Sequence, residues 1–463
     1  MPQRKQKTSP SKPTLPPQLA AVTWHAAGID VGAAAHFVAV PPRDDPPPVR
    51  RFGAYTADRD SRADGLLLGG ITTVALASTG VYGLPLLERL EARGCEGCLV
   101  EPPHVQKSKG RPTSDGHDGQ WSQRRHTCGR LARACRPPAQ VCVLRSSLRQ
   151  RAMLLISAAQ HIQPMPKALT QMHIQLQHVV SDITGGTGRA ILRARLAGER
   201  APATRAQWRD DRCQHDEATM ARAWQGTGRE APLCAVAHAV ALYEVYHQQL
   251  TEGDRQIETS LQTFAARSDG QPWPPPARRR QRGRNQPAFA VRDPLHRIPG
   301  VDLPQIEGLD ATTALGILSE IGLAMPRWPT VQHCTSWLGL CPHHRVSGGK
   351  VRRRRTQPCA QRAATAFRLA AAALPHRQRA LGAFFRRMKA RLGAPKAITA
   401  TAHKLARLVY TRRKHGTAYV PQGLDEDEQP DRDRTVKHVT RRAQTFGSTL
   451  VKTSEVPAQG ALA

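Results

Sequence analysis

The chain has 463 residues, of which 68 are Lys or Arg and 36 are Asp or Glu, so its net charge is +32. This length allows two or three domains with sizeable cores, and no apolar run is long enough for a membrane span. Such unbalanced charge opposes compaction, so it indicates a polyanionic partner, and nucleic acid fits best. An arginine bias from a high-GC coding sequence is the competing explanation, but bias alone does not account for an excess of 32.

Ten cysteines are scattered along the chain without the spacing of metal ligands. Cys95 and Cys98 form one C-x₂-C pair, but no second pair follows, so we do not expect a zinc ribbon. Residues 1–22 are basic and Pro-rich, which predicts a disordered tail rather than a signal peptide. We therefore expect a cytoplasmic, nucleoid-associated protein with reduced cysteines and no membrane association.

Strand-like and helix-like segments alternate in the first third of the chain. A short strand is typical where apolar residues run between Gly or Pro, and a helix where they recur at a spacing of 3.6. The expected elements are a β-hairpin at 24–40, a strand at 71–76, a helix at 84–92 and a strand at 98–100. This alternation predicts an α/β domain over residues 23–140.

The middle of the chain predicts long helices over residues 141–268. Helical periodicity covers 144–180 and 218–264. Pro164 and Pro166 interrupt the first of these, and each costs about 3 kcal/mol in an unrelieved helix interior. We therefore expect a kink or a break there.

The remaining chain begins with a Pro- and Arg-rich linker at 269–290, whose arginines between 278 and 284 either remain solvated or contact a phosphate backbone. Residues 291–420 predict a mainly helical domain, and 421–463 a frayed, charged tail. The helices expected in this domain lie at 312–321, 360–374 and 381–392. The fold class is therefore α/β plus α.

Three aspartates lie in Gly-flanked motifs that are typical of strand ends or helix starts. Asp30 ends the apolar run of G-I-D-V-G, while Asp115 and Asp118 are three residues apart, so on a helix they share a face. Taken singly, Asp30 is explained as a turn aspartate, and the other two as a helix cap and a first-turn acid, with Ser114 as the alternative cap. Taken together, three carboxylates from separate elements suit a metal site, because hard oxygen ligands hold Mg²⁺ against a phosphate.

Ser347 lies in R-V-S-G-G-K, where two glycines give the backbone room and Arg345 and Lys350 supply positive charge. A serine that attacks a phosphodiester needs such cations and a group that takes its proton. On spacing alone, an ordinary serine in a Gly-rich turn explains the motif better.

Four spaced motifs between Trp24 and Tyr419 resemble the motifs of a known protein family. They are G-I-D-V-G with His36 and V-A-V, then V-A-L-A-S-T-G-V-Y (74–82), G-R-P-T-S-D-G-H-D-G-Q-W (110–121), and S-W-L-G-L-C-P (336–342) followed by V-S-G-G-K. In this order they resemble the insertion-sequence transposases of the Piv-invertase type, the DEDD transposases that a bridge RNA guides.

The resemblance implies a RuvC-like ribonuclease H fold in the N-terminal domain, with Asp30, Asp115 and Asp118 as catalytic ligands of Mg²⁺. It implies that the central helices form a dimerising coiled coil, so a dimer or tetramer is expected. In the C-terminal domain it implies Ser347 as the nucleophile that joins transiently to DNA. The expected partners are the DNA ends of the element, a target DNA and a structured guide RNA. The basic residues expected to hold nucleic acid are Arg345, Lys350, Arg352, Arg353, Arg354 and Arg355.

The chain departs from the family pattern at three positions. Ala77 stands where the family has a glutamate, and Ala33 and Thr113 stand where it has lysines. Alanine cannot ligate a cation, so the expected metal site loses one ligand and one negative charge. Glu88 lies in the following helix, and we do not expect it to compensate.

These motifs are compatible with three functions. The favoured one is DNA transposition or recombination by serine attack on a phosphodiester with Mg²⁺. The second is a catalytically inactive, nucleic-acid-binding remnant of a transposase, which Ala77 favours. The third is a RuvC-like Holliday-junction nuclease that uses water, but such an enzyme needs neither the Ser347 loop nor S-W-L-G-L-C-P.

Overall fold

A computed structural model of the chain forms two compact units, Met1–Arg136 and Pro137–Ala463. The structure describes residues 23–42, 48–78, 80–100, 114–131, 133–134, 136–199, 201, 215–267, 283, 285–356, 359, 361–416, 436 and 439–447. The predicted tail at 1–22, most of the predicted tail at 421–463 and the arginines of the 278–284 run lie outside these residues.

The first unit contains a mixed five-stranded sheet. Its strands are β1 (Ala26–Val31), β2 (Ala35–Ala39), β3 (Val49–Gly53), β4 (Thr73–Ser78) and β5 (Glu96–Val100), in the spatial order β3-β2-β1-β4-β5. The first three strands pair antiparallel. Strand β4 pairs parallel with β1, and β5 pairs parallel with β4. The predicted hairpin and α/β layer are confirmed, β3 was not predicted, and the RuvC-like assignment stays a prediction.

Helices cover both faces of this sheet. They are α1 (Thr56–Leu68), α2 (Gly83–Ala92) and α4 (Asp115–Thr127). Leu66 of α1 and Leu86 of α2 share a buried core with Ile29 of β1, so these two helices lie on one face. Gly28 alternates with Ile29 and approaches α4, which therefore covers the other face. Helix α1 was not predicted, because its sequence is mostly polar and buries only Arg62, Ala63 and Leu66.

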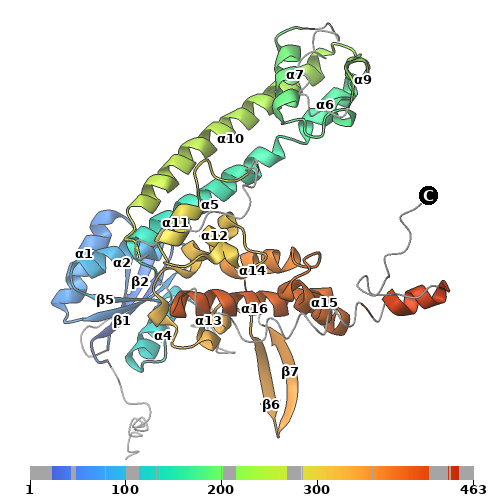
Figure 1. Cartoon of the computed structure of the whole chain (residues 1–463). Coiled ribbons are helices and arrows are strands. Elements are labelled where there is room, and N and C mark those ends of the chain that lie inside the picture. Colours follow the sequence, from blue (N-terminus) through green and yellow to red (C-terminus); the bar gives the residue numbers. More distant parts are fainter. Residues whose placement is uncertain are drawn as a thin grey trace, which may run out of the picture. The chain divides into compact units, whose positions relative to one another are not determined.

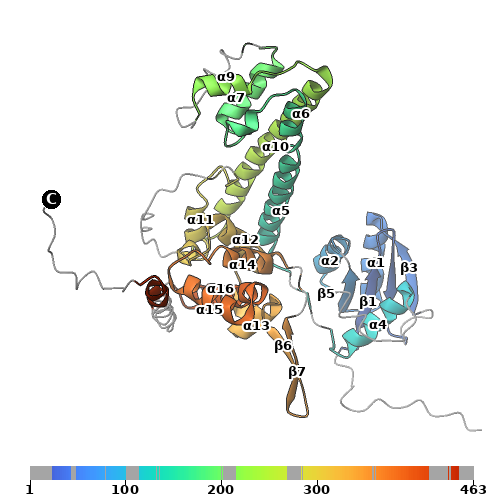
Figure 2. The same ribbon diagram turned by 90° about the vertical axis from the view of Figure 1, so that its right-hand side faces the viewer.

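The second unit begins with two long helices, α5 (Ala139–Gln160) and α10 (Glu230–Gln262), which run side by side (Figures 1 and 2). The chain between them forms a small helical cap at their far end. Its elements are α6 (Pro164–Gln171), η2 (Leu176–His178), α7 (Gly186–Leu196) and α9 (Glu217–Ala223). The cap has its own core, in which Leu169, Ile191 and Trp224 pack against Tyr243 of α10.

The predicted interruption at Pro164 is a clean break rather than a strained kink. Helix α5 ends at Gln160, and Pro164 is the first residue of α6. At that position the missing N–H would have no helical partner, and the fixed φ of proline suits a helix start. The penalty expected for a proline inside a helix therefore does not arise.

A buried ion pair joins α5 to α10. Arg151 Nε donates to Asp254 Oδ1 at 2.5 Å, and the two side chains are 7% and 5% exposed. The same groups bind the start of the following segment, because Arg151 Nη1 donates to Asn285 O and Ala288 N donates to Asp254 Oδ2. The pair therefore aligns α5 with α10 and holds the segment at Asn285 and Ala288 against both helices.

The C-terminal part is helical with one β-hairpin. Its elements are α11 (Arg292–Arg297), η3 (Leu303–Gln305), α12 (Ala311–Ile321), η4 (Met325–Arg327), α13 (Val331–Trp337), β6 (Pro342–Ser347), β7 (Lys350–Thr356), α14 (Arg362–Ala372), α15 (Ala380–Leu392) and α16 (Ala394–His415). The three helices predicted here correspond to α12, α14 and α15, whereas α16 was not predicted. Helix α16 contacts α13, α14 and α15, so it organises this core. The hairpin projects away from these helices (Figures 1 and 2).

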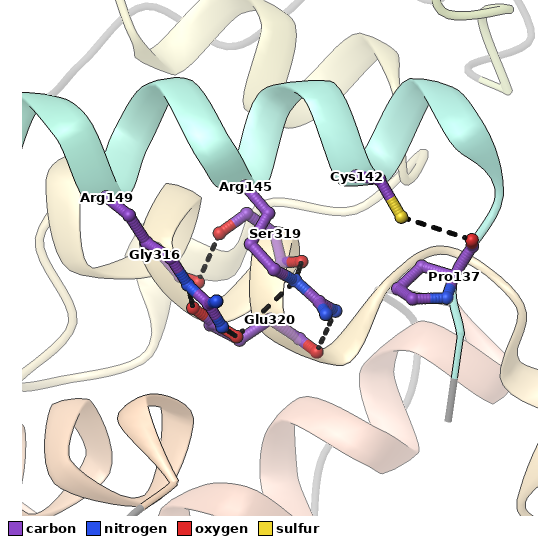
Figure 3. A network of polar contacts seen from close by, with 7 residues as sticks. All are labelled: Pro137, Cys142, Arg145, Arg149, Gly316, Ser319 and Glu320. Carbon is purple, nitrogen blue, oxygen red and sulfur yellow. Dashed lines mark hydrogen bonds and ion pairs between the residues drawn. The ribbon is translucent and has the colours of Figure 1, made fainter. Parts of the chain in front are cut away.

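A polar network ties the start of α5 to the end of α12 (Figure 3). Arg145 donates to the carbonyls of Ser319 and Glu320, which are among the last carbonyls of α12 without helical partners. Arg149 makes a two-pronged ion pair with the Glu320 carboxylate at 2.9 and 2.8 Å. These contacts join the long helices to the C-terminal helices within the second unit.

Asp254→Ala should lower the free energy of unfolding by about 3–5 kcal/mol, because it leaves the Arg151 charge buried without its partner. The double variant Arg151→Met/Asp254→Leu should recover most of this loss, since it removes both charges. Urea unfolding followed by circular dichroism measures both. Equal losses in the single and double variants would contradict the stabilising role given to the ion pair.

Candidate functional site

Asp30 lies near the end of β1 and is half-buried, on the face that α4 covers. Burial raises the pKa of its carboxyl to about 6, and the nearby charge of Asp115 adds to this, while a backbone hydrogen bond at Val31 acts in the opposite direction. Asp30 and Asp115 therefore repel each other when both are ionised. A cation between them would relieve that repulsion.

Close backbone packing brings α4 to β1. A side chain at Gly28 would overlap backbone atoms of Gly119 and Gln123, and one at Gly119 would lie 3.1 Å from Phe37 O. Two polar contacts fix the position of the helix: Gln123 Nε2 donates to Ala26 O at 3.2 Å, and His126 Nε2 lies 2.9 Å from Thr73 Oγ1. Residues of both glycine motifs thus meet here.

The two aspartates at the start of α4 also have a local explanation, as acidic residues in the first turn of a helix. Ser114 caps the helix, since its side chain accepts from His117 N. Asp115 is exposed at the first helical position, and Asp118 is half-buried in the first turn. Negative charge is favourable at a helix N-terminus, so the local explanation applies to these two residues, and their role as metal ligands stays a prediction.

Ala77 is the direct neighbour of Asp30, because the two are paired in the parallel register of β4 with β1. It is 5% exposed. Ala77 shares a small apolar cluster with Ala75, Cys98 and Val100, and Trp121 of α4 packs against it. The missing glutamate of the family pattern therefore corresponds to an apolar position beside Asp30.

The side chains available as ligands limit how a metal ion could bind here. Within the part of the chain that the structure describes, no three His, Cys, Asp or Glu side chains form a group that could hold a metal. Asp30 and Asp115 supply two carboxylates close enough to interact, and proteins often hold Mg²⁺ by one or two carboxylates together with substrate phosphates and water. The three-carboxylate site stays a prediction.

His36 lies on the opposite face of the sheet from Asp30. It pairs in register with Val31 and is fully buried. Burial lowers the pKa of its imidazole to about 4, and the charges of Arg62 and Arg59 reinforce this. His36 is therefore neutral at pH 7 and separate from the aspartates.

Ser347 lies at the tip of the β6–β7 hairpin. Gly348 and Gly349 form its two-residue turn with φ of +57° and +71°, values that suit a type I′ turn and that favour glycine. Ser347 and Lys350 flank the turn as paired residues, and both are exposed. The sequence predicts a Gly-rich turn here, and the structure adds the two flanking strands, for which a Gly-Gly pair between strand-like residues is a signal. The backbones of Arg345 and Arg352–Arg355 lie on the two strands, but their side chains lie outside what the structure describes.

Comparison with known families finds one match, in the second unit. Residues 302–386 match the model described as "Transposase IS116/IS110/IS902 family". The matched segment runs from η3 into α15 and includes the Ser347 hairpin. No curated protein matches the chain. The match supports an insertion-sequence transposase. No described helix has the length and apolar character needed to cross a membrane.

Asp30→Asn should raise the thermal stability of the metal-free protein at neutral pH. The folded-state pKa is about 6 and the unfolded value is 3.8. The stabilisation that protonated Asp30 contributes is therefore complete below about pH 3.8 and is lost as the pH rises through 6. The neutral amide avoids this loss, so the melting temperatures should diverge between pH 4 and 6, with the variant higher above 6. Calorimetric melting curves that stay parallel across this range would contradict the assigned environment of Asp30.

Proposed function

We propose that this protein is an insertion-sequence transposase that cuts and rejoins DNA through Mg²⁺-dependent attack of Ser347 on a phosphodiester. The observation that carries the proposal is the transposase match at residues 302–386, which includes the serine hairpin. The electrostatic coupling of Asp30 with Asp115, on a sheet compatible with a RuvC-like ribonuclease H domain, supports the metal-dependent part.

Asp30 and Asp115 would hold Mg²⁺, and Asp118 would add charge from the first turn of α4. The ion supplies charge neutralisation at the reacting phosphate. The chain contributes the placement of these carboxylates, since α4 is fixed on β1 by the packing of Gly28 against Gly119 and by Gln123. Because Asp30 is half-buried, its carboxylate is less hydrated than one in water and interacts more strongly with a cation.

Ser347 would supply the attacking oxygen. Its Oγ forms a bond to phosphorus, the bond from phosphorus to one sugar oxygen breaks, and that oxygen leaves with a proton. The hydroxyl proton passes to a base. The joined serine ester keeps the energy of the broken bond, so a second DNA end can replace the serine without an outside energy source. The exposed position of Ser347 at a hairpin tip suits an approach to DNA.

The partners in this proposal are DNA and RNA. Arg345, Lys350 and Arg352–Arg355 would hold the phosphates of the element ends and the target, and a structured guide RNA would select the target. The pair α5 and α10 would join copies of the chain into a dimer or tetramer. The net charge of +32 supports nucleic-acid binding in general.

Ala77→Glu should raise Mg²⁺ affinity on the order of tenfold, because it adds a negative charge beside Asp30 that attracts the cation. In the absence of metal the same change should lower the melting temperature, since a carboxylate then faces an apolar cluster and a like charge. Calorimetric titration with Mg²⁺ measures the affinity.

Ala77→Gln is the matched control, because it has the same size without the charge and should not gain affinity. If the glutamine variant gains as much as the glutamate variant, or neither gains, the site beside Asp30 is not a metal site.

Ser347→Ala should abolish covalent protein–DNA adducts and leave DNA affinity nearly unchanged. The substitution removes the attacking oxygen but none of the positive charges, and phosphate contacts supply most non-specific affinity. Adducts are detected as shifted bands on denaturing gels, and binding by fluorescence anisotropy. Ser181→Ala, an exposed serine of the helical cap, is the control that should keep adduct formation. An adduct that persists in Ser347→Ala means that another residue is the nucleophile.

The second candidate is a catalytically inactive remnant that still binds nucleic acid. The apolar environment of Ala77 beside Asp30 favours it. The two candidates differ in whether covalent protein–DNA adducts form. An active transposase forms them as the wild-type chain with matched DNA and RNA, whereas an inactive remnant does not. If only Ala77→Glu forms them, the chain is a remnant inactivated at that position.

A further inference from the structure

The C-terminal helices contain an unusually long stretch without acidic residues. Residues 321–424 hold 21 Lys and Arg residues and no Asp or Glu. The helices α13, α14, α15 and α16 all lie in this stretch, so positive charges on their outer faces have no carboxylate on these helices to neutralise them. The stretch supplies a large part of the net charge of +32.

Two faces within this stretch meet at one aromatic ring. On α15, Phe384, Arg387 and Arg391 follow one another at spacings of three and four, so they share a face. On α16, Lys396, Lys404 and Arg407 lie at spacings of eight and three, which places them within one arc of the helix. The two helices pack against each other.

Phe384 lies where the two faces join, and cations from both helices contact its ring. Lys404 Nζ lies 4.3 Å from the ring centroid and Arg387 Cζ lies 5.5 Å from it. Phe384 is half-buried, and Arg391, Lys396 and Arg407 are exposed on the same two helices. The result is a basic surface with an aromatic side chain at its centre.

This combination has a defined chemical preference. Nucleic-acid strands with unpaired bases bind where a positive surface follows the phosphates and an aromatic ring stacks on a base, and arginine adds a cation–π contribution. A duplex offers phosphates but keeps its bases stacked inside, so it does not use the ring. A protein partner would need acidic residues and would leave the ring without a stacking ligand.

We propose that the α15–α16 surface centred on Phe384 binds single-stranded DNA, with a base that stacks on the Phe384 ring beside Arg387 and Lys404. This site is distinct from the Ser347 hairpin and does not require the DNA-joining chemistry. Its substrate is a strand whose bases have separated from their complement, the state that DNA passes through when ends are exchanged.

The first test is Phe384→Leu in the full-length chain. The change keeps an apolar side chain of similar size but removes the stacking ring, so affinity for a single-stranded DNA of about 20 nucleotides should fall about 5- to 150-fold. Affinity for the matched duplex should stay within about twofold, and Phe384→Trp should retain single-strand affinity. Anisotropy titrations measure each value, and melting temperatures show that the variants are folded.

The second test measures the phosphate contacts. Replacing Arg391, Lys396 and Arg407 by Gln should reduce the slope of log affinity against log salt by about 2 for single-stranded DNA, since each phosphate contributes about 0.7. The control replaces the exposed residues Lys167, Arg222 and Arg229 of the helical cap, which changes the net charge equally and should leave the slope nearly unchanged.

Three outcomes would overturn the proposal. Equal losses for single strand and duplex in Phe384→Leu would mean that the ring is not a stacking site. A loss confined to an RNA of the same sequence would assign the surface to RNA. An equal reduction of the salt slope in the control variant would mean that net charge, and not this surface, attracts the strand.

Discussion

The contact between Gly28 of β1 and Gly119 of α4 is the constraint on which the first unit depends. Only two residues without side chains allow a helix backbone to approach a strand so closely, and any Cβ at Gly28 would overlap α4. The contact lets the first turn of α4, with Asp115 and Asp118, extend beside the end of β1. A larger residue at either position would move the helix outward and separate Asp115 from Asp30.

The same arrangement has an electrostatic consequence. The ionised form of Asp30 is disfavoured by its burial and by the charge of Asp115, so this carboxylate reduces folding stability at neutral pH without a counter-ion. Such a cost is typical of sites that serve function rather than folding. The position beside Asp30 is Ala77, so this chain carries less negative charge there than its motif pattern predicts. Any cation bound there therefore depends more on the phosphates of its substrate.

Sequence periodicity predicted the elements with clear apolar patterns, such as the β1–β2 hairpin, α2 and α12. It missed α1, whose surface is polar, and α16, whose Ala- and Thr-rich start has no strong apolar period. The resemblance assigned Ala77 to the same site as Asp30, but their pairing came only from the structure, because strand register is a long-range property. The meeting of Gly28 with Gly119 and the approach of Lys404 of α16 to Phe384 of α15 depend on packing between separate elements, which no local pattern encodes.

Metal binding by the unmodified chain is the most direct test of whether Asp30 and Asp115 form a cation site. Mn²⁺ serves as the probe, because its paramagnetism reports binding by electron paramagnetic resonance and it accepts the same oxygen ligands as Mg²⁺. We expect the wild-type chain to bind Mn²⁺ in the presence of DNA, the binding to weaken as the pH falls below about 6, and Asp30→Asn to abolish it. Equal Mn²⁺ affinity in the wild-type and Asp30→Asn proteins would mean that Asp30 is not part of a cation site.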